Sequence, residues 1–205
     1  MSPLRAIRLV AWALVVILGA SLAITFAVRE QAAPGGPESA MPRDARALFG
    51  GPFSIGDMRG GRITDRDLIG KPSLLFFGFT HCPDVCPTTL TDISDWLDKL
   101  GDAGKELTAY LVTVDPERDT PAFLREYLAA FDDRIVGLVG DENETRRIAE
   151  AWRVHYRRVP LDGGNYTMDH TASVFMIDRK GQFAGTIDFH EDREVALAKL
   201  RTLVR

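Results

Sequence analysis

The sequence predicts an α/β domain with a mixed central sheet flanked by helices, behind a single N-terminal transmembrane helix. Three observations lead to this prediction. Short apolar runs alternate with amphipathic segments over most of the 205 residues, which is typical of α/β proteins. Two β-type runs near the C-terminus are separated only by a Lys-Gly turn, which indicates an antiparallel hairpin. An uncharged apolar stretch of membrane-spanning length precedes all of these elements.

The apolar stretch is at residues 9–28 (LVAWALVVILGASLAITFAV). As a helix at 1.5 Å per residue it spans about 30 Å, the hydrocarbon thickness of a bilayer. Arg5 and Arg8 precede it, so the positive-inside rule places residues 1–8 in the cytoplasm and the rest of the chain outside. A cleaved signal peptide is the alternative, although its apolar region is usually shorter, about 7 to 15 residues.

The composition and the apolar stretch together favour a bacterial protein whose domain lies in the periplasm and does not bind nucleic acid. Twenty arginines against five lysines favour a bacterial source, in which the anchor would lie in the inner (cytoplasmic) membrane. Residues 29–46 are rich in alanine, proline, glycine and charge, so we interpret them as a flexible linker. Residues 47–205 are long enough for one domain with a full core. A net charge of -4 without a basic stripe argues against a nucleic-acid partner.

The expected domain begins with a small hairpin and a buried strand. Two short β-type runs, at residues 53–55 and 62–64, flank a Gly-Gly turn and predict an N-terminal hairpin. Residues 73–79 (SLLFFGF) are almost continuously apolar. This pattern is typical of a central strand that is covered on both faces.

An amphipathic helix is expected next, at residues 87–100. Its apolar residues recur every three or four positions, and Pro87 suits the first helical position. A polar loop containing His170 is expected to lead into a buried strand near the C-terminus. The remaining predicted elements are strands at residues 107–114, 135–139, 155–159, 174–177 and 182–187, and helices at residues 119–131, 142–152 and 194–203.

The only two cysteines, Cys82 and Cys86, lie in FGFTHCPDVCPTTL (residues 77–90), where the first central strand meets the first long helix. Reactive groups of such sheets gather at the carboxyl ends of the strands. With Pro87 as the first helical residue, Cys86 is expected at the helix cap, where unpaired N–H groups favour a thiolate. The pair is a structural disulfide, a redox couple or half of a metal site. A disulfide that closes so short a loop restrains little unfolded-state entropy, so the structural disulfide is the least favoured.

Three of the four histidines are poor candidates for a third metal ligand. His81 is adjacent to Cys82 but is expected to point away from it. His155 and His190 lie in charged segments, so we interpret both as surface residues.

His170 is the remaining candidate, because it stands just before the buried strand at residues 174–177. If that strand neighbours residues 73–79, His170 passes close to the cysteines. From the residues alone it is either a ligand or an ordinary capping or core histidine. Two thiolates and one imidazole would suit Cu(I) best, and Cu(II) with an added water or carboxylate.

Three motifs occur in one order behind the apolar stretch: FGFTHCPDVCP at residues 77–87, VDPERDTP at residues 114–121 and DHTA at residues 169–172. Together they resemble the Sco/SenC family of copper chaperones, over about residues 50–203. The resemblance implies a thioredoxin-like fold. It also implies a site for Cu(I) and Cu(II) made by Cys82, Cys86 and His170.

The resemblance further implies a membrane-anchored metallochaperone, not an enzyme, that delivers copper to the CuA centre of cytochrome c oxidase subunit II. Other copper carriers or thiol reductants are further expected partners. The alternative is a thiol-disulfide reductase that keeps the copper-ligand cysteines of the oxidase reduced, because the same cysteines suit that chemistry. A peroxidase or redox sensor is a third possibility. Asp115 matches an acidic family position for redox control or docking, and is otherwise a strand-end turn residue.

Overall fold

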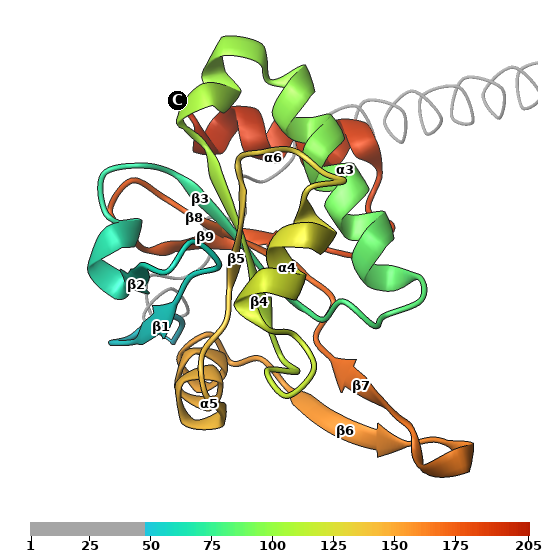
Figure 1. Ribbon diagram of the computed structural model, residues 1–205. Coiled ribbons are helices and arrows are strands. Elements are labelled where there is room, and N and C mark those ends of the chain that lie inside the picture. Colours follow the sequence, from blue (N-terminus) through green and yellow to red (C-terminus); the bar gives the residue numbers. More distant parts are fainter. Residues whose placement is uncertain (1–47) are drawn as a thin grey trace, which may run out of the picture. The chain divides into compact units, whose positions relative to one another are not determined.

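The computed structural model describes residues 48–205, which are arranged around a five-stranded central sheet (Figure 1). The strand order is β5-β4-β3-β8-β9. Strands β3, β4 and β5 are parallel, whereas β8 and β9 run antiparallel to their neighbours. The prediction of a mixed sheet with a C-terminal hairpin is therefore confirmed. The strand bounds are β3 Ser73–Gly78, β4 Thr108–Thr113, β5 Ile135–Leu138, β8 Val174–Ile177 and β9 Phe183–Ile187.

The predicted cytoplasmic segment 1–8, transmembrane helix 9–28 and linker 29–46 lie outside the described residues. Within residues 48–205, no helix is both long enough and apolar enough to cross a membrane.

Strand β3 lies at the centre of the sheet and leads into the cysteine loop. All six of its residues are buried, as its continuous apolar run predicts for a strand covered on both faces. It pairs with β4 on one side and with β8 on the other. Phe77 packs edge-on against Phe175 of β8, with ring centroids 6.0 Å apart. The short segment between His170 and β8 is thereby held beside the end of β3.

Within residues 48–205, four α-helices surround the sheet: α3 Val85–Lys99, α4 Pro121–Leu128, α5 Glu142–Ala151 and α6 Arg193–Leu203. Helices α3 and α6 lie side by side (Figure 1), joined by an ion pair of 3.4 Å between Arg193 and Asp95. Short 3-10 helices occur at Asp65–Leu68, Gly101–Glu106 and Asp162–Gly164.

Helix α3 begins two residues earlier than predicted. Its N-cap residue is Asp84, so Cys86 lies within the first turn and Pro87 is the third helical residue. The prediction that Cys86 sits at the cap is therefore wrong. Proline is compatible with any position of the first turn, because the N–H groups there have no acceptor within the helix. A proline alone therefore predicts the start of a helix only to within about two residues.

A two-stranded ribbon, formed by β6 (Tyr156–Pro160) and β7 (Tyr166–His170), is separate from the central sheet and projects away from it (Figure 1). The polar loop predicted around His170 is therefore wrong, since His170 is the last residue of a strand. The strand at residues 155–159 was predicted, but it pairs with β7 and not with the central sheet. Gly163 and Gly164, with φ of 77° and 80°, reverse the chain between the two strands.

The predicted N-terminal hairpin is present as β1 (Ser54–Gly56) and β2 (Arg62–Thr64), which pair in antiparallel orientation. Gly56 holds the hairpin against the end of β5, because its carbonyl accepts the N–H of Val139 at 2.9 Å. A Cβ atom on Gly56 would lie 2.7 Å from the carbonyl oxygen of Val139. Only glycine allows this approach of two backbones.

Gly56→Ala is expected to lower the free energy of unfolding by about 1–3 kcal/mol, because the new methyl group forces the two backbones apart. The measurement is urea denaturation of the full chain, followed by circular dichroism. Ser54→Ala, an exposed change on the same strand, is the matched control and should stay within about 0.5 kcal/mol of the parent. Equal unfolding free energies for the two variants would contradict the packing described.

Candidate metal centre

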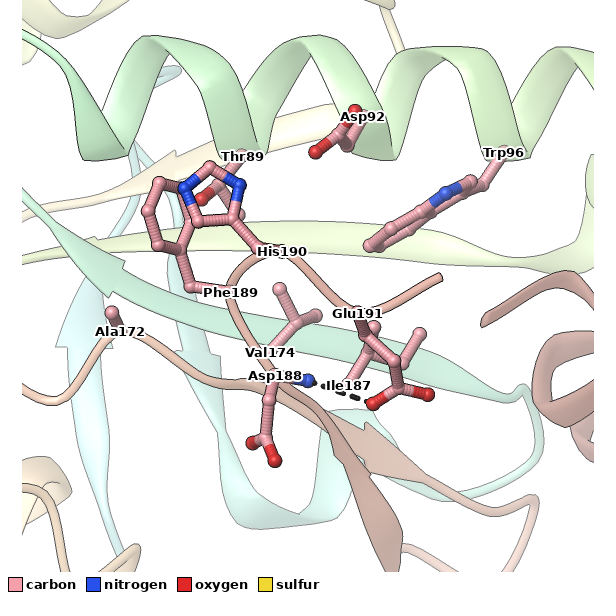
Figure 2. Close-up of a pocket in the computed structure, with 10 residues that line it drawn as sticks. All are labelled: Thr89, Asp92, Trp96, Ala172, Val174, Ile187, Asp188, Phe189, His190 and Glu191. Atoms are coloured by element: carbon pink, nitrogen blue, oxygen red, sulfur yellow. Dashed lines mark hydrogen bonds between the residues drawn. The ribbon is translucent and has the colours of Figure 1, made fainter. Parts of the chain in front are cut away.

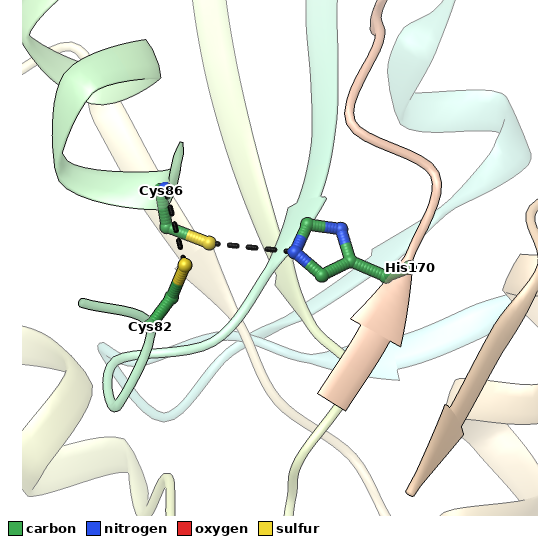
Figure 3. A group of neighbouring side chains, drawn as sticks. All are labelled: Cys82, Cys86 and His170. Carbon is green, nitrogen blue, oxygen red and sulfur yellow. Dashed lines mark hydrogen bonds between the residues drawn. The ribbon is translucent and has the colours of Figure 1, made fainter. Parts of the chain in front are cut away.

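Three side chains from separate elements converge at the carboxyl end of β3 (Figure 3). Cys82 comes from the loop after β3, Cys86 from the first turn of α3 and His170 from the end of β7. Their potential ligand atoms all lie within 4.8 Å of one another. The Sγ atom of Cys86 is 3.5 Å from Nε2 of His170. Within residues 48–205, no other group of three or more His, Cys, Asp or Glu side chains is arranged so closely.

The other three histidines lie outside this group, as the sequence suggested. His81 is exposed, with its Nδ1 3.0 Å from the hydroxyl of Thr80 and its ring packed on Phe123. His155 and His190 are also exposed. None of the three therefore brings a ring nitrogen to the two sulfurs.

The imidazole of His170 is oriented with Nε2 toward the sulfurs. Its Nδ1 lies 3.0 Å from the carbonyl oxygen of Thr171. Since a carbonyl oxygen only accepts hydrogen bonds, Nδ1 carries the proton and Nε2 presents its lone pair to Cys86. The rings of Phe76 and Phe79 pack edge-on to the imidazole, at 6.2 and 5.8 Å between centroids. The tautomer and the ring orientation both suit a metal ligand.

Cys82, and not Cys86, is the thiolate of the pair. Its Sγ lies at the N-terminus of α3 and accepts the N–H of Cys86 at 3.4 Å. The hydrogen bond from the Cys86 thiol, together with the backbone N–H groups of Cys86 and Asp84, lowers the pKa of Cys82 to about 3. The same interaction and burial raise the pKa of Cys86. The prediction of a Cys86 thiolate is therefore wrong, because the sulfur at the helix N-terminus belongs to the residue before the helix.

The buried sulfur of Cys86 occupies space that is open only because Gly78, the last residue of β3, has no side chain. A Cβ atom on Gly78 would lie 3.0 Å from Cys86 Sγ and 3.2 Å from a methyl carbon of Leu111. Any larger residue at this position would push on the sulfur and on the neighbouring strand. The end of β3 is thus shaped for Cys86.

The loop from Asp115 to Asp119 holds the cysteine side of the centre through Asp119. Asp119 is fully buried. Its carboxylate accepts hydrogen bonds from the backbone N–H of Thr80 at 3.1 Å and from the hydroxyls of Thr80 and Thr113 at 2.5 and 2.6 Å. These bonds fix Thr80, two residues before Cys82, relative to β4. We call residues 115–119 the clamp loop.

The clamp loop holds the histidine side of the centre through Asp115. The Asp115 carboxylate is 2% exposed, accepts the phenol hydrogen of Tyr166 at 2.8 Å and pairs with Arg118. Arg118 also donates to the Tyr166 carbonyl at 3.1 Å and stacks on its ring, 3.8 Å from the centroid. Tyr166 begins β7, the strand that ends in His170. Asp115 is thus a turn residue, as one interpretation held, and also a structural link to the ribbon.

Sequence reasoning missed Thr80, Asp119 and Tyr166. The motif VDPERDTP contained the relevant signal, because a second aspartate four positions after Asp115 in a strand-to-helix loop can face the neighbouring loop. No local pattern links Tyr166 to that motif, since the two meet only after the ribbon folds back.

A small cavity lies beneath α3 (Figure 2). Thr89, Asp92 and Trp96 line it from the helix, and His190 lines it from the loop after β9. Its volume is about 10 Å³, which is close to the minimum for one water molecule. Burial raises the pKa of the Asp92 carboxyl. The cavity is too small for a substrate, so the three-residue cluster remains the candidate site.

Comparison with known proteins identifies the family of the chain. The SCO1/SenC family model matches residues 41–205. The chain is 36% identical to the mitochondrial protein SCO1 of Saccharomyces cerevisiae, over 74% of this chain and 52% of that protein. It is 35% identical to the protein SenC of Rhodobacter capsulatus, over 87% of this chain and 79% of that protein. The chain thus spans about half the length of its yeast relative.

Solved structures of similar sequence share the fold. The ScoI protein of Bradyrhizobium japonicum, solved with copper bound, is 44% identical, with a TM-score of 0.70 over 76% of this chain and 99% of that one. Yeast Sco1, also solved with copper bound, is 36% identical, with a TM-score of 0.71 over 76% of this chain and 88% of that one. These likenesses confirm the thioredoxin-like fold that the motifs implied. The chain belongs to the SCO1/SenC family.

Proposed function

We propose that this chain is a copper chaperone of cytochrome c oxidase assembly, which binds copper through Cys82, Cys86 and His170. The observation that carries the proposal is the convergence of two sulfurs and one imidazole nitrogen within 4.8 Å of one another. Copper is the cargo, and the proposed recipient is the CuA centre of cytochrome c oxidase subunit II. Other copper carriers or thiol reductants would load the site or keep it reduced.

The donor set favours copper over other metals. Two cysteine sulfurs and one neutral imidazole are soft ligands, whereas Mg²⁺ and Ca²⁺ prefer oxygen. Structural zinc usually takes four protein ligands, and the described residues offer a group of three. Cu(I) accepts such a low coordination number, and Cu(II) would add a water or a carboxylate. The copper found in the solved relatives from Bradyrhizobium and yeast supports the same choice.

The exposure of the ligands suits transfer by ligand exchange. Cys82 is partly exposed, and Cys86 is buried. An incoming thiolate of a recipient can therefore reach the metal on the Cys82 side while Cys86 still holds it. His170 is carried by the projecting ribbon and not by the central sheet. Exchange would thus proceed one ligand at a time, without release of free copper.

The proposal includes an anchored location. Residues 9–28 would span the inner membrane of a bacterium once, with the copper-binding domain in the periplasm. The uncharged apolar stretch and the preceding Arg5 and Arg8 support this topology. An oxidising compartment would also explain why the cysteines need a metal or a reductant to stay out of a disulfide.

A second candidate function is thiol-disulfide reduction, which the pairing of a partly exposed thiolate with a buried thiol favours. The Cys82 thiolate would attack a disulfide of the partner, form a mixed disulfide and release one partner thiolate. Cys86, after losing its proton, would attack Cys82 Sγ and release the second thiolate. The products are a reduced partner and a Cys82–Cys86 disulfide. An external thiol reductant would reduce this disulfide, become oxidised itself and regenerate the two thiols.

His170→Ala is expected to weaken Cu(II) binding by at least about tenfold and Cu(I) binding much less, because two sulfurs alone still hold the softer ion. The measurement is competition titration of the reduced full chain in detergent micelles with chelators of known affinity. His155→Ala, an exposed histidine on the ribbon side, is the control and should bind like the parent. Unchanged copper retention in the double variant Cys82→Ala, Cys86→Ala would contradict the proposed site.

Tyr166→Phe is expected to weaken Cu(II) binding by about tenfold while Cu(I) binding changes little, because loss of the bond to Asp115 loosens the strand that presents His170. The same competition titration measures both ions, and the Cu(II) absorption spectrum reports the ligand set. Tyr156→Phe removes a hydroxyl from the other strand of the ribbon and serves as the control. Equal loss for Cu(I) and Cu(II) would indicate general unfolding, and contradict a role in positioning His170.

Cys82 is expected to react with iodoacetamide at an almost constant rate from neutral pH to well below pH 6, because its lowered pKa keeps the thiolate as pH falls. An ordinary thiol, with a pKa near 8.5, slows by about tenfold per pH unit below that value. The measurement is mass spectrometry of the metal-free, reduced chain after timed alkylation. Cys82→Ala leaves only Cys86, which should react slowly near neutral pH. A midpoint near 8.5 for Cys82 would refute the assignment.

A further inference from the structure

A groove of about 660 Å³ lies beside the ribbon and is distinct from the cluster of Cys82, Cys86 and His170. Three elements line it: the loop after β4, the start of α5 and the inner face of the ribbon. These elements stand together at the lower side of the domain in Figure 1. The groove is thus large enough for a side chain or a short peptide segment, and nothing in the proposed copper chemistry uses it.

The lining of the groove is strongly acidic. Four carboxylates face it, from Asp115, Glu117, Asp141 and Glu142, against one guanidinium, from Arg158. The difference is a lining charge of -3, in a chain whose total is only -4. The groove therefore attracts cations and repels anions.

Most of these charges have partners, but one carboxylate does not. Asp115 pairs with Arg118, and Glu117 pairs with Arg158. The Asp141 side chain caps α5 by accepting the N–H of Glu144. Glu142 is exposed, and within residues 48–205 its carboxylate makes neither a hydrogen bond nor an ion pair. Its charge is available to a ligand.

A buried hydroxyl in the lining also lacks a partner. Thr145 is 1% exposed, and its Oγ1 makes no hydrogen bond to the described part of the chain. Three other helical threonines bond the carbonyl four residues earlier, as Thr89 does to Val85 at 2.8 Å. Leaving a buried hydroxyl unpaired is unfavourable by about 1–3 kcal/mol. Thr145 therefore offers an acceptor to an N–H donor that enters the groove, independently of the acidic residues.

The ribbon provides the apolar wall and links the groove to the metal centre. Tyr156 and Met168 line the groove and suit the methylene stem of a long side chain. In the ribbon, Tyr156 lies opposite His170, and Arg158 lies opposite Met168. Opposed residues of an antiparallel pair share one face. The face that presents His170 to the cysteines therefore continues directly into the groove.

We propose that this groove binds a lysine or arginine side chain of the protein that docks at the metal centre. The cationic head would meet Glu142 and the Thr145 hydroxyl, and the stem would pack on Tyr156 and Met168. The identification of that protein as the recipient of copper rests on the proposed function. The binding of a basic side chain does not depend on copper.

The test is a titration of the ¹⁵N-labelled, reduced, metal-free full chain in detergent micelles with acetyl-Gly-Arg-Gly-amide and acetyl-Gly-Lys-Gly-amide, followed by NMR. Saturable shifts are expected at the amides of Glu142, Thr145, Tyr156 and Met168, with a millimolar Kd that rises with salt. The neutral citrulline analogue of the arginine peptide should bind at least about threefold more weakly.

Two variants of the chain test the contacts. Glu142→Gln and Thr145→Val should each weaken the arginine peptide by about threefold. Glu150→Gln, the same charge change at an exposed site farther along α5, should leave the Kd unchanged. The copper affinity of Glu142→Gln should equal that of the parent. The proposal for the groove and the proposal for the copper site can therefore be tested separately.

The proposal would be overturned by equal binding of the citrulline peptide, by shifts that map outside the groove, or by the absence of saturable shifts. Shifts of the same amides on dilution of the protein alone would assign the groove to a second copy of this chain, and would equally contradict it.

Discussion

The candidate metal centre depends on one short loop with two buried carboxylates. Residues 115–119 lie between β4 and α4, and they bond to the segments that carry Cys82 and His170. Asp119 fixes the backbone before Cys82, and Asp115 fixes Tyr166 at the start of the strand that carries His170. The N–H of Asp119 also donates to the Asp115 carbonyl at 3.0 Å, so the two attachments form one rigid unit. Hydrogen bonds to buried carboxylates are among the stronger ones in proteins, which makes this loop a suitable reference for both halves of the site.

The electrostatics of the pair explain why copper binding and thiol exchange are hard to separate in this fold. The hydrogen bond between the two sulfurs, together with the N–H groups at the start of α3, stabilises negative charge on Cys82, and the same hydrogen bond together with burial keeps the proton on Cys86. A bound metal ion would displace that proton, since cysteine binds metals as the thiolate. A disulfide partner would meet the same exposed thiolate first. What distinguishes the two chemistries is His170, which gives a metal a third ligand and has no necessary part in exchange.

The sequence predicted the parts of the fold that depend on local pattern. The buried run of β3, the amphipathic face of α3 and the N-terminal hairpin follow from periodicity and turn residues that lie within a few positions of each other. The start of α3 does not follow from local pattern, because Pro87 is acceptable anywhere in the first turn. The resulting two-residue error led to the prediction that Cys86, and not Cys82, is the thiolate. The ribbon does not follow from local pattern either, since β7 pairs only with β6 and the polar, alternating residues of β7 resemble a loop. The contacts of Thr80 with Asp119 and of Tyr166 with Asp115 join residues 39 and 51 positions apart, and no local pattern encodes them.

The proposed function requires that two sulfurs and one imidazole nitrogen bind a single copper ion. X-ray absorption spectroscopy of the full chain loaded with one equivalent of Cu(I) tests it most directly, because it counts and identifies the atoms bound to the metal. We expect two sulfur ligands and one nitrogen ligand in the parent, and loss of the nitrogen alone in His170→Ala. A parent spectrum without sulfur ligands, or one that keeps its nitrogen after the substitution, would contradict it.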